Sequence, residues 1–157
     1  MVFYNFDYSK WDKTKGDGVG LVLLTTQTPT SIEDVELFLK EWEKVYTKCM
    51  EDNCKYTLVF DTRKVSKFDI KYLKLMGKWL KKMKTMTENW MDRTAIIVSN
   101  PIIKGFISFV FLIYKPVRPF KVFASDELVK SIEWSLSKNP GDDPEKLMSD
   151  VSTVGTA

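Results

Sequence analysis

The stretch from residue 56 to residue 99 constrains the fold more than any other part of the chain. Two short apolar runs, YTLVFD at 56–61 and TAIIVS at 94–99, flank a segment at 69–87 whose apolar residues recur at helical spacing. Short apolar runs are typical of buried strands, and a period near 3.6 residues is typical of an amphipathic helix. Strand, helix and strand in this order predict two parallel strands joined by a right-handed crossover.

The same alternation continues along most of the chain. Further strands are expected at 2–8, 19–25 and 120–124, and further helices at 28–50, 102–114 and 125–138. Asn100 and Pro101 form a helix start, with an N-cap followed by proline at the first helical position. The order β-β-α-β-α-β-α-β-α predicts an α/β domain with a mostly parallel five-stranded sheet and four helices. We assign this domain to 1–138 and expect a polar, mobile tail at 139–157.

Composition excludes several classes of enzyme. The 157 residues include no histidine, which removes histidine acid–base catalysis, Ser-His-Asp and Cys-His nucleophiles and most zinc sites. The chain has no P-loop, no glycine-rich phosphate cradle and no nucleophile elbow. We therefore expect a protein that is not an enzyme and uses no cofactor or metal, with Asp61 as the one exception left open. Cys49 and Cys54 are expected to be free thiols.

The first residues and the longest apolar run bear on location. The N-terminal sequence MVFYNFDYSKWDK lacks the basic start and long apolar core of a signal peptide. The run at 106–114 is shorter than the roughly 20 apolar residues that cross a bilayer. We expect a cytoplasmic protein that attaches peripherally to membranes if its basic and apolar surfaces act together.

The helix expected at 69–87 has an almost purely cationic face. At about 100° per residue, five lysines fall within roughly 100° of arc: Lys71, Lys74, Lys78, Lys81 and Lys82. The face is either ordinary solvated surface or, with Lys115 and Arg118, a docking surface for an acidic protein partner or anionic lipid headgroups. Arginine, which suits bidentate phosphate and base recognition, is scarce, and this argues against nucleic acid as a partner.

The segment at 102–114 is apolar almost all round. It is either buried between the sheet and a neighbouring helix, or exposes one face to a ligand cavity, a membrane or a dimer partner. The residues expected to contact an apolar ligand are Phe106, Phe109, Val110, Ile113 and Tyr114. Basic residues at both ends of this segment are typical of a peripheral membrane element.

Polar residues follow two neighbouring strands of the expected sheet. Asp61 and Arg63 lie at the end of one strand, and Asn100 follows the next. Ligands of open α/β sheets bind at the carboxyl ends of the strands, so this cluster is a candidate site for a polar headgroup or a small anion. The alternative is helix capping and loop hydrogen bonding, which Asn and Asp favour.

Two segments resemble known families. LVFDTRKVSKFDIKYL, at 58–73, is similar to the strand–loop–helix unit of STAS domains of anti-sigma-factor antagonists. The segment at 88–123 resembles the second half of CRAL-TRIO lipid-binding domains. There a strand leads to an Asn-x-Pro-like turn, an apolar gate helix, a Lys-Pro pair and a further strand. In this chain, Asn100, Pro101, the run at 106–114 and the Lys115–Pro116 pair take those places.

The resemblance spans roughly residues 19–137 and implies a binding or regulatory α/β domain. Where STAS regulators carry a phosphorylated serine, this chain has DIKY at 69–72, so no phosphorylation switch is implied. We predict a non-enzymatic module that docks to a protein partner or an anionic membrane through the lysine-rich helix and the apolar helix beside it. The alternative is a carrier of a lipid or other small apolar ligand in a cavity under the helix at 102–114, and a homodimer is left open.

Overall fold

The strands lie in the sheet in the same order as along the chain. The computed structural model describes residues 3–11 and 19–137, and the tail expected at 139–157 lies outside the described residues. The strands are β1 (Tyr4–Lys10), β2 (Val19–Gln27), β3 (Lys55–Lys64), β4 (Met91–Val98) and β5 (Phe120–Ala124). β1 pairs antiparallel with β2, and β2, β3, β4 and β5 pair in parallel. The prediction of an α/β fold with a five-stranded sheet is confirmed.

The described residues form five helices, not the four that the sequence predicted. They are α1 (Ile32–Asp52), α2 (Ile70–Lys82), α3 (Lys84–Trp90), α4 (Pro101–Ile113) and α5 (Leu128–Leu136). The single helix expected over 69–87 divides at Met83, where φ of −92° and ψ of 8° leave the α-helical region. The predicted start of α4 is confirmed, because the Asn100 side chain accepts a hydrogen bond from the backbone N–H of Ile102.

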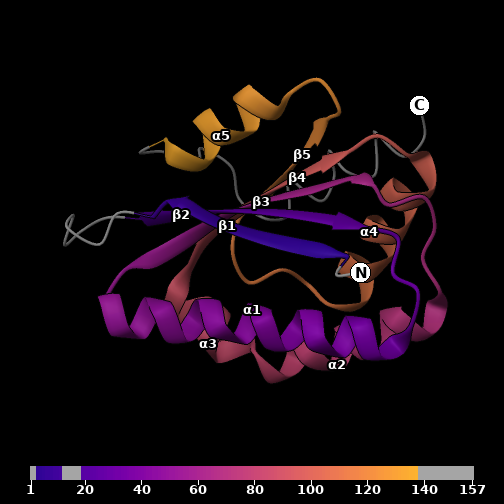
Figure 1. The fold of residues 1–157 in the computed structure, drawn as a ribbon, viewed down its shortest axis with the longest axis horizontal. Helices are drawn as coiled ribbons and strands as arrows, with labels where there is room; N and C mark the ends of the chain where they lie inside the picture. The colour runs from indigo at the N-terminus through magenta and orange to yellow at the C-terminus, as the bar shows by residue number, and fades with distance from the viewer. Residues whose placement is uncertain (1–2, 12–18, 138–157) are drawn as a thin grey trace.

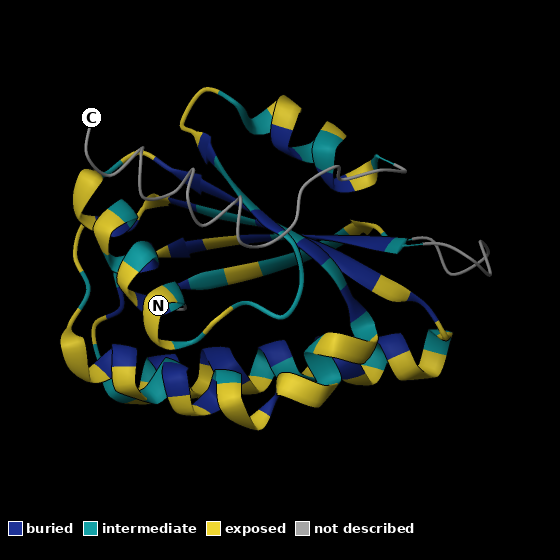
Figure 2. Ribbon diagram, turned by 180° about the vertical axis from the view of Figure 1, so that it is seen from behind, coloured by how far each residue is buried: buried dark blue, intermediate teal, exposed yellow. Residues whose placement is uncertain are grey.

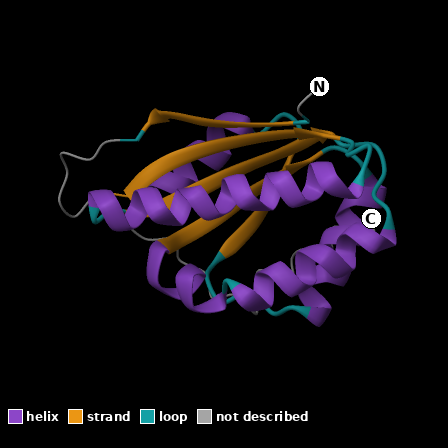
Figure 3. Cartoon of the chain, turned by 60° about the horizontal axis from the view of Figure 1, so that its bottom comes forward, coloured by secondary structure: helices purple, strands orange, loops and turns teal. Residues whose placement is uncertain are grey.

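All the helices that connect parallel strands lie on one face of the sheet. Each connection moves one strand further in the same direction, and right-handed crossovers then place every connecting helix on the same side. Figure 1 shows α1, α2 and α3 on the opposite side of the sheet from α5. Figure 3 shows α1 lying beside α2 and α3 beneath the strands.

Strand residues alternate between two cores. On β3, Leu58 packs in the core under α1, and the next residue, Val59, packs in the core under α5. The core under α1 is rich in aromatic residues, including Phe38 and Trp42. Figure 2 shows dark-blue buried positions along the sides of the helices that face the sheet.

A chain of buried hydrogen bonds joins α1 to β3 and α3. Trp42 Nε1 donates to the Tyr56 hydroxyl at 3.1 Å, and Tyr56 donates to the Tyr46 hydroxyl at 3.0 Å. The Tyr46 hydroxyl also bonds Thr87 Oγ1 at 2.8 Å. Burial raises the pKa of Tyr56 well above its ordinary value, so this hydroxyl stays protonated and keeps donating. These bonds fix how far α1 and α3 stand from the amino-terminal part of β3.

Tyr56→Phe tests this network. Removal of the hydroxyl leaves the Trp42 N–H without its acceptor, and we expect the free energy of unfolding to fall by about 1–3 kcal/mol in urea titrations. Tyr72→Phe is the control, because the Tyr72 ring is also buried but its hydroxyl forms no hydrogen bond within 3–11 and 19–137. That control is expected to change stability by less than about 0.5 kcal/mol. Equal losses in both variants would contradict a stabilising role for the network.

Candidate functional site

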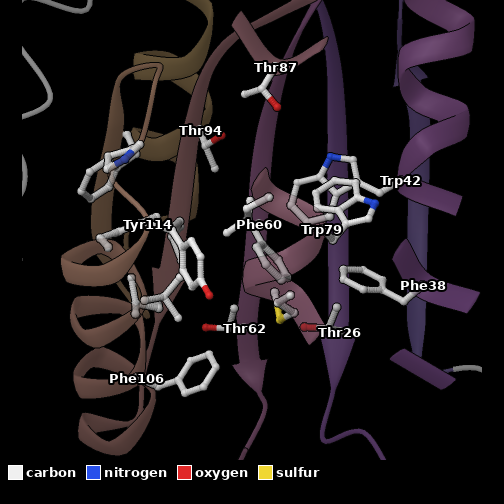
Figure 4. A pocket seen from close by; sticks show the side chains of 18 of the residues that line it. Thr26, Phe38, Trp42, Phe60, Thr62, Trp79, Thr87, Thr94, Phe106 and Tyr114 are labelled. Carbon is white, nitrogen blue, oxygen red and sulfur yellow. The ribbon is translucent and has the colours of Figure 1, made fainter. Parts of the chain in front are cut away.

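A cavity of about 610 Å³ lies between the sheet and the helices α1, α2 and α4. Its walls are mostly apolar, and many are aromatic. In the close view of Figure 4, Phe38, Trp42 and Trp79 line one side of the cavity, and Phe106 and Tyr114 line the other. Pockets that enclose one small organic molecule typically measure about 300–1,000 Å³ and are lined mainly by hydrophobic and aromatic residues. The cavity has the size and lining of a site for one apolar molecule.

Threonines from three neighbouring strands supply hydroxyls to this otherwise apolar wall. Strand alternation directs Thr26 of β2, Thr62 of β3 and Thr94 of β4 toward the cavity (Figure 4). Thr62 Oγ1 donates to the backbone oxygen of Ile97 at 2.7 Å. Thr26 Oγ1 is buried and has no hydrogen-bond partner among the described residues. This hydroxyl is free to bond a polar group inside the cavity.

An irregular segment, residues 114–119, closes the cavity between α4 and β5. We call it the strap. It crosses the space between the sheet and the layer of α2 and α3, as Figures 1 and 2 show. It begins where the Tyr114 ring lies against Gly77 of α2. It ends where the backbone oxygen of Pro119 accepts a hydrogen bond from the Thr94 N–H at 3.0 Å.

Among the described residues, every charged side chain that lines the cavity is a cation. These are Lys81, Lys84, Lys115 and Arg118. The chain has no acidic residue within 70–87 or 94–125, the two segments that contribute these cations. Arg118 Nε is buried without a hydrogen-bond partner, and none of the four cations forms an ion pair within the part of the chain that the structure describes. The described part of the cavity therefore has a positive edge with no counter-charge of its own.

The outer face of α4 is an exposed apolar stripe. Ile102 is 67% exposed, Phe109 46%, Leu112 70% and Ile113 52%. The opposite face packs inward through Ile103, Ile107 and Val110. Both faces of α4 are thus apolar. Leu112 and Ile113, at the end of the helix, also border the cavity, whereas Ile102 and Phe109 do not. No helix in the described ranges is both long enough and apolar enough to cross a bilayer.

Four of the five apolar residues that the sequence predicted as ligand contacts line the cavity, and one does not. Phe106, Val110, Ile113 and Tyr114 line the cavity. Phe109 does not line it and lies on the exposed stripe. The difference follows from helical rotation, because neighbouring positions on a helix lie about 100° apart and face different surroundings.

The lysines of the cationic helix are all exposed but do not act as one set. Lys71 pairs with Asp69 at 3.7 Å, and Lys82 pairs with Glu43 of α1 at 3.1 Å. Lys81 is the member of the predicted set that lines the cavity. Lys74 and Lys78 point to solvent without an ion pair in the described ranges.

The polar residues at the sheet end bond one another and their neighbours. Arg63 donates to both carboxylate oxygens of Asp61, at 2.9 and 2.7 Å, and to the backbone oxygen of Ser125 at 3.2 Å. Burial raises the pKa of Asp61, but the hydrogen bonds and charge of Arg63 outweigh burial and hold the pKa below its ordinary value. Asn100 caps α4 and donates to the backbone oxygen of Ser66 at 3.0 Å. None of the three lines the cavity, and their contacts fit the capping and loop interpretation.

Other reactive groups do not assemble into a second site. Cys49 and Cys54 are both buried, and burial raises the pKa of the Cys49 thiol to about 12. A thiol with that pKa stays protonated at neutral pH and is a poor nucleophile. Within 3–11 and 19–137, no three Cys, Asp or Glu side chains lie close enough together to hold a metal ion.

Comparison with protein-family models, with curated proteins and with solved structures gives no match for this chain. The proposed function therefore rests on the residues of the cavity and of α4.

Sequence reasoning missed most of the cavity wall. Phe38, Trp42 and Phe60 looked like ordinary core positions, because an apolar residue at helical or strand spacing has the same pattern whether it faces a neighbour or a void. The available signal was the inward threonines, Thr26 and Thr62, which interrupt apolar strands on the core side.

The contact between Gly77 and Tyr114 predicts that the effect of Gly77→Ala on stability depends on whether the Tyr114 ring is present. A Cβ at Gly77 would overlap the Tyr114 ring, although alanine is otherwise favoured over glycine inside a helix by about 1 kcal/mol. We expect Gly77→Ala to stabilise the protein by about 0.5–1 kcal/mol in a Tyr114→Ala background and to give no gain, or a loss, in the wild type. A double-mutant cycle by urea unfolding measures this difference. The same gain in both backgrounds would contradict the contact.

Proposed function

We propose that this protein is a carrier that binds one apolar or amphipathic small molecule of lipid size in the cavity beneath α4, with no chemistry of its own. The cavity of about 610 Å³ with its apolar wall is the observation that supports this function. Transport of a small apolar ligand is the alternative that the sequence offers to surface docking. The position of α4 beside the cavity also fits the gate helix that the CRAL-TRIO resemblance implies, so we keep that resemblance within the proposal.

The energetics of the cavity favour an occupant. Apolar atoms that line an unfilled space lose the dispersion contacts that a close-packed interior supplies. Water is poorly held where polar partners are few. An apolar ligand supplies the contacts that the wall otherwise lacks.

Val110→Trp tests carriage by filling the cavity. Val110 is buried on the cavity side of α4, and we expect the indole to occupy ligand space while the protein stays folded. Binding of the neutral lipophilic dye Nile red, followed by fluorescence, should weaken at least about tenfold, equivalent to ~1.4 kcal/mol. Native mass spectrometry and organic extraction of the purified wild type should reveal a bound lipid that the variant lacks.

Phe109→Trp is the matched control for this variant. It introduces the same indole on the same helix, but on the exposed stripe rather than in the cavity. It should leave dye binding and the extracted lipid unchanged. Equal binding by all three proteins, or an empty wild type that binds no dye, would overturn the carrier proposal.

A second candidate function is docking of α4 to an anionic membrane. The exposed stripe of Ile102, Phe109, Leu112 and Ile113 supports it, together with Lys104 and Lys115 at its two ends. Burial of one large apolar side chain contributes about 1.5–3 kcal/mol when it is complete. Each cation near an anionic surface adds about 1 kcal/mol. Stable attachment generally needs two such signals, and α4 presents both.

Vesicle flotation tests the docking candidate. The wild type should float with phosphatidylserine–phosphatidylcholine vesicles at low salt, less so at raised salt, and poorly with phosphatidylcholine alone. Replacement of Ile102 and Phe109 by serine, which leaves the cavity lining intact, should abolish flotation. Leu37→Ser on α1, which removes another exposed apolar residue, is the control and should float normally.

Two outcomes would contradict membrane docking. One is flotation by the double variant at the wild-type level. The other is a wild type that does not float but sediments as a dimer, with the double variant monomeric, which would assign the stripe to a second copy of the chain.

A further inference from the structure

The charged groups of the cavity indicate which kind of ligand it takes. We propose that the ligand is a single-chain amphiphile whose anionic head, a carboxylate or a phosphate, binds Arg118 at the strap while its apolar tail fills the cavity. This rests on the carrier function proposed above and deepens it by naming the ligand class. The observations behind it are the buried, unpartnered donor of Arg118 and the absence of acidic residues from the lining that the described residues form.

Arg118 is the strongest single indication. Its Nε atom is buried and has no hydrogen-bond partner in the described ranges, although a buried donor without an acceptor is costly. A guanidinium is a planar fork that matches the paired oxygens of a carboxylate or phosphate. An anionic group entering from the cavity would supply the acceptor that the protein does not.

Three lysines reinforce the same charge from two sides. Lys81 and Lys84 line the cavity from α2 and the start of α3, and Lys115 lines it from the strap beside Arg118. All three are exposed overall, so their aliphatic stems line the cavity while their charged ends reach water. Such groups attract an anionic head without being buried themselves, and they disfavour a cationic ligand.

The rest of the cavity suits an uncharged tail. Phe38, Trp42 and Phe60 belong to the part of the wall formed by α1 and β3, which contributes no charged side chain to the lining. A ligand with a polar group at each end would leave one of these groups in the mostly apolar part of the wall. A hydrocarbon chain with one anionic end matches both regions of the cavity.

Thr26 defines the competing arrangement. Its hydroxyl is the other buried and unpartnered polar atom among the described residues, and it also lines the cavity. A neutral ligand such as an alcohol could bond Thr26 and need no cation. The two arrangements predict different preferences within one series of ligands.

The test compares dodecyl compounds on the intact protein. Dodecanoate, dodecyl phosphate, 1-dodecanol and dodecylamine differ only in the head, and displacement of Nile red gives their affinities. We expect at least one of the two anions to bind about tenfold or more tightly than the alcohol, the effect of a charge-assisted hydrogen bond, and the amine to bind more weakly than the alcohol. Comparison of the two anions distinguishes a fatty carboxylate from a phosphate head. Raised salt should reduce the difference in affinity between the anions and the alcohol.

Variants then locate the head. Arg118→Gln should weaken the anions about tenfold and leave dodecanol unchanged, and Arg118→Lys should recover part of the loss. Lys78→Gln is the matched control, because Lys78 lies on α2 one turn from Lys81 but does not line the cavity. It should bind every compound like the wild type. Circular dichroism checks that each variant is folded. The affinities of the wild type for the four dodecyl compounds test the proposal even if a variant does not fold.

Three results would overturn the assignment. If the wild type bound dodecanol and both anions with equal affinity, the proposal that the ligand has an anionic head would be wrong. Loss of binding in Thr26→Val, with Arg118→Gln unaffected, would place the head at Thr26. Failure of every dodecyl compound to displace the dye or to bind would instead refute the carrier function, and the headgroup assignment with it.

Discussion

The direction in which the chain crosses the sheet governs the rest of the structure. From β2 to β5 every connection steps the same way, and right-handed crossovers place each connecting helix on the same face. That face must accommodate α1, α2, α3 and α4, whereas the other face carries α5. The layer beneath the sheet is therefore crowded with helices of unequal length that meet at angles, and a cavity remains between them and the strands.

The boundaries of the cavity are set by a few specific contacts rather than by general apolar packing. At one end the hydrogen-bond chain through Tyr56 holds α1 and α3 at a fixed distance from β3. Where α4 ends, the Tyr114 ring lies against Gly77, and the strap then leads back across the opening to β5. Tyr46, Thr87 and Tyr114, which form these contacts, all line the cavity. They connect the fold to the proposed carriage of a small molecule.

The strands and most helix positions could be predicted because their patterns are local. The apolar run at 56–61 and the Asn100–Pro101 pair specify a strand and a helix start without reference to the rest of the chain. The break at Met83 was not predictable in this way, since Met83 itself and the lysines on either side of it, Lys82 and Lys84, all favour helix. The lysine face was recognised, but its division into Lys82, which pairs with Glu43, and Lys81, which borders the cavity, depends on what α1 and the strap place beside it.

By itself the sequence determined the α/β class, the five strands and the basic character of the segments around α2 and α4, because these follow from hydrophobic period and local charge. Only the tertiary structure decided which apolar residues face a void, which face solvent and which pack. Phe106 and Phe109 have the same chemistry and lie on the same helix, yet one lines the cavity and the other is exposed. A pattern of apolar residues predicts that a surface will be buried, but the surface that packs against it is formed by distant parts of the chain. Whether that surface fits closely or leaves space for another molecule is settled only when the layers meet.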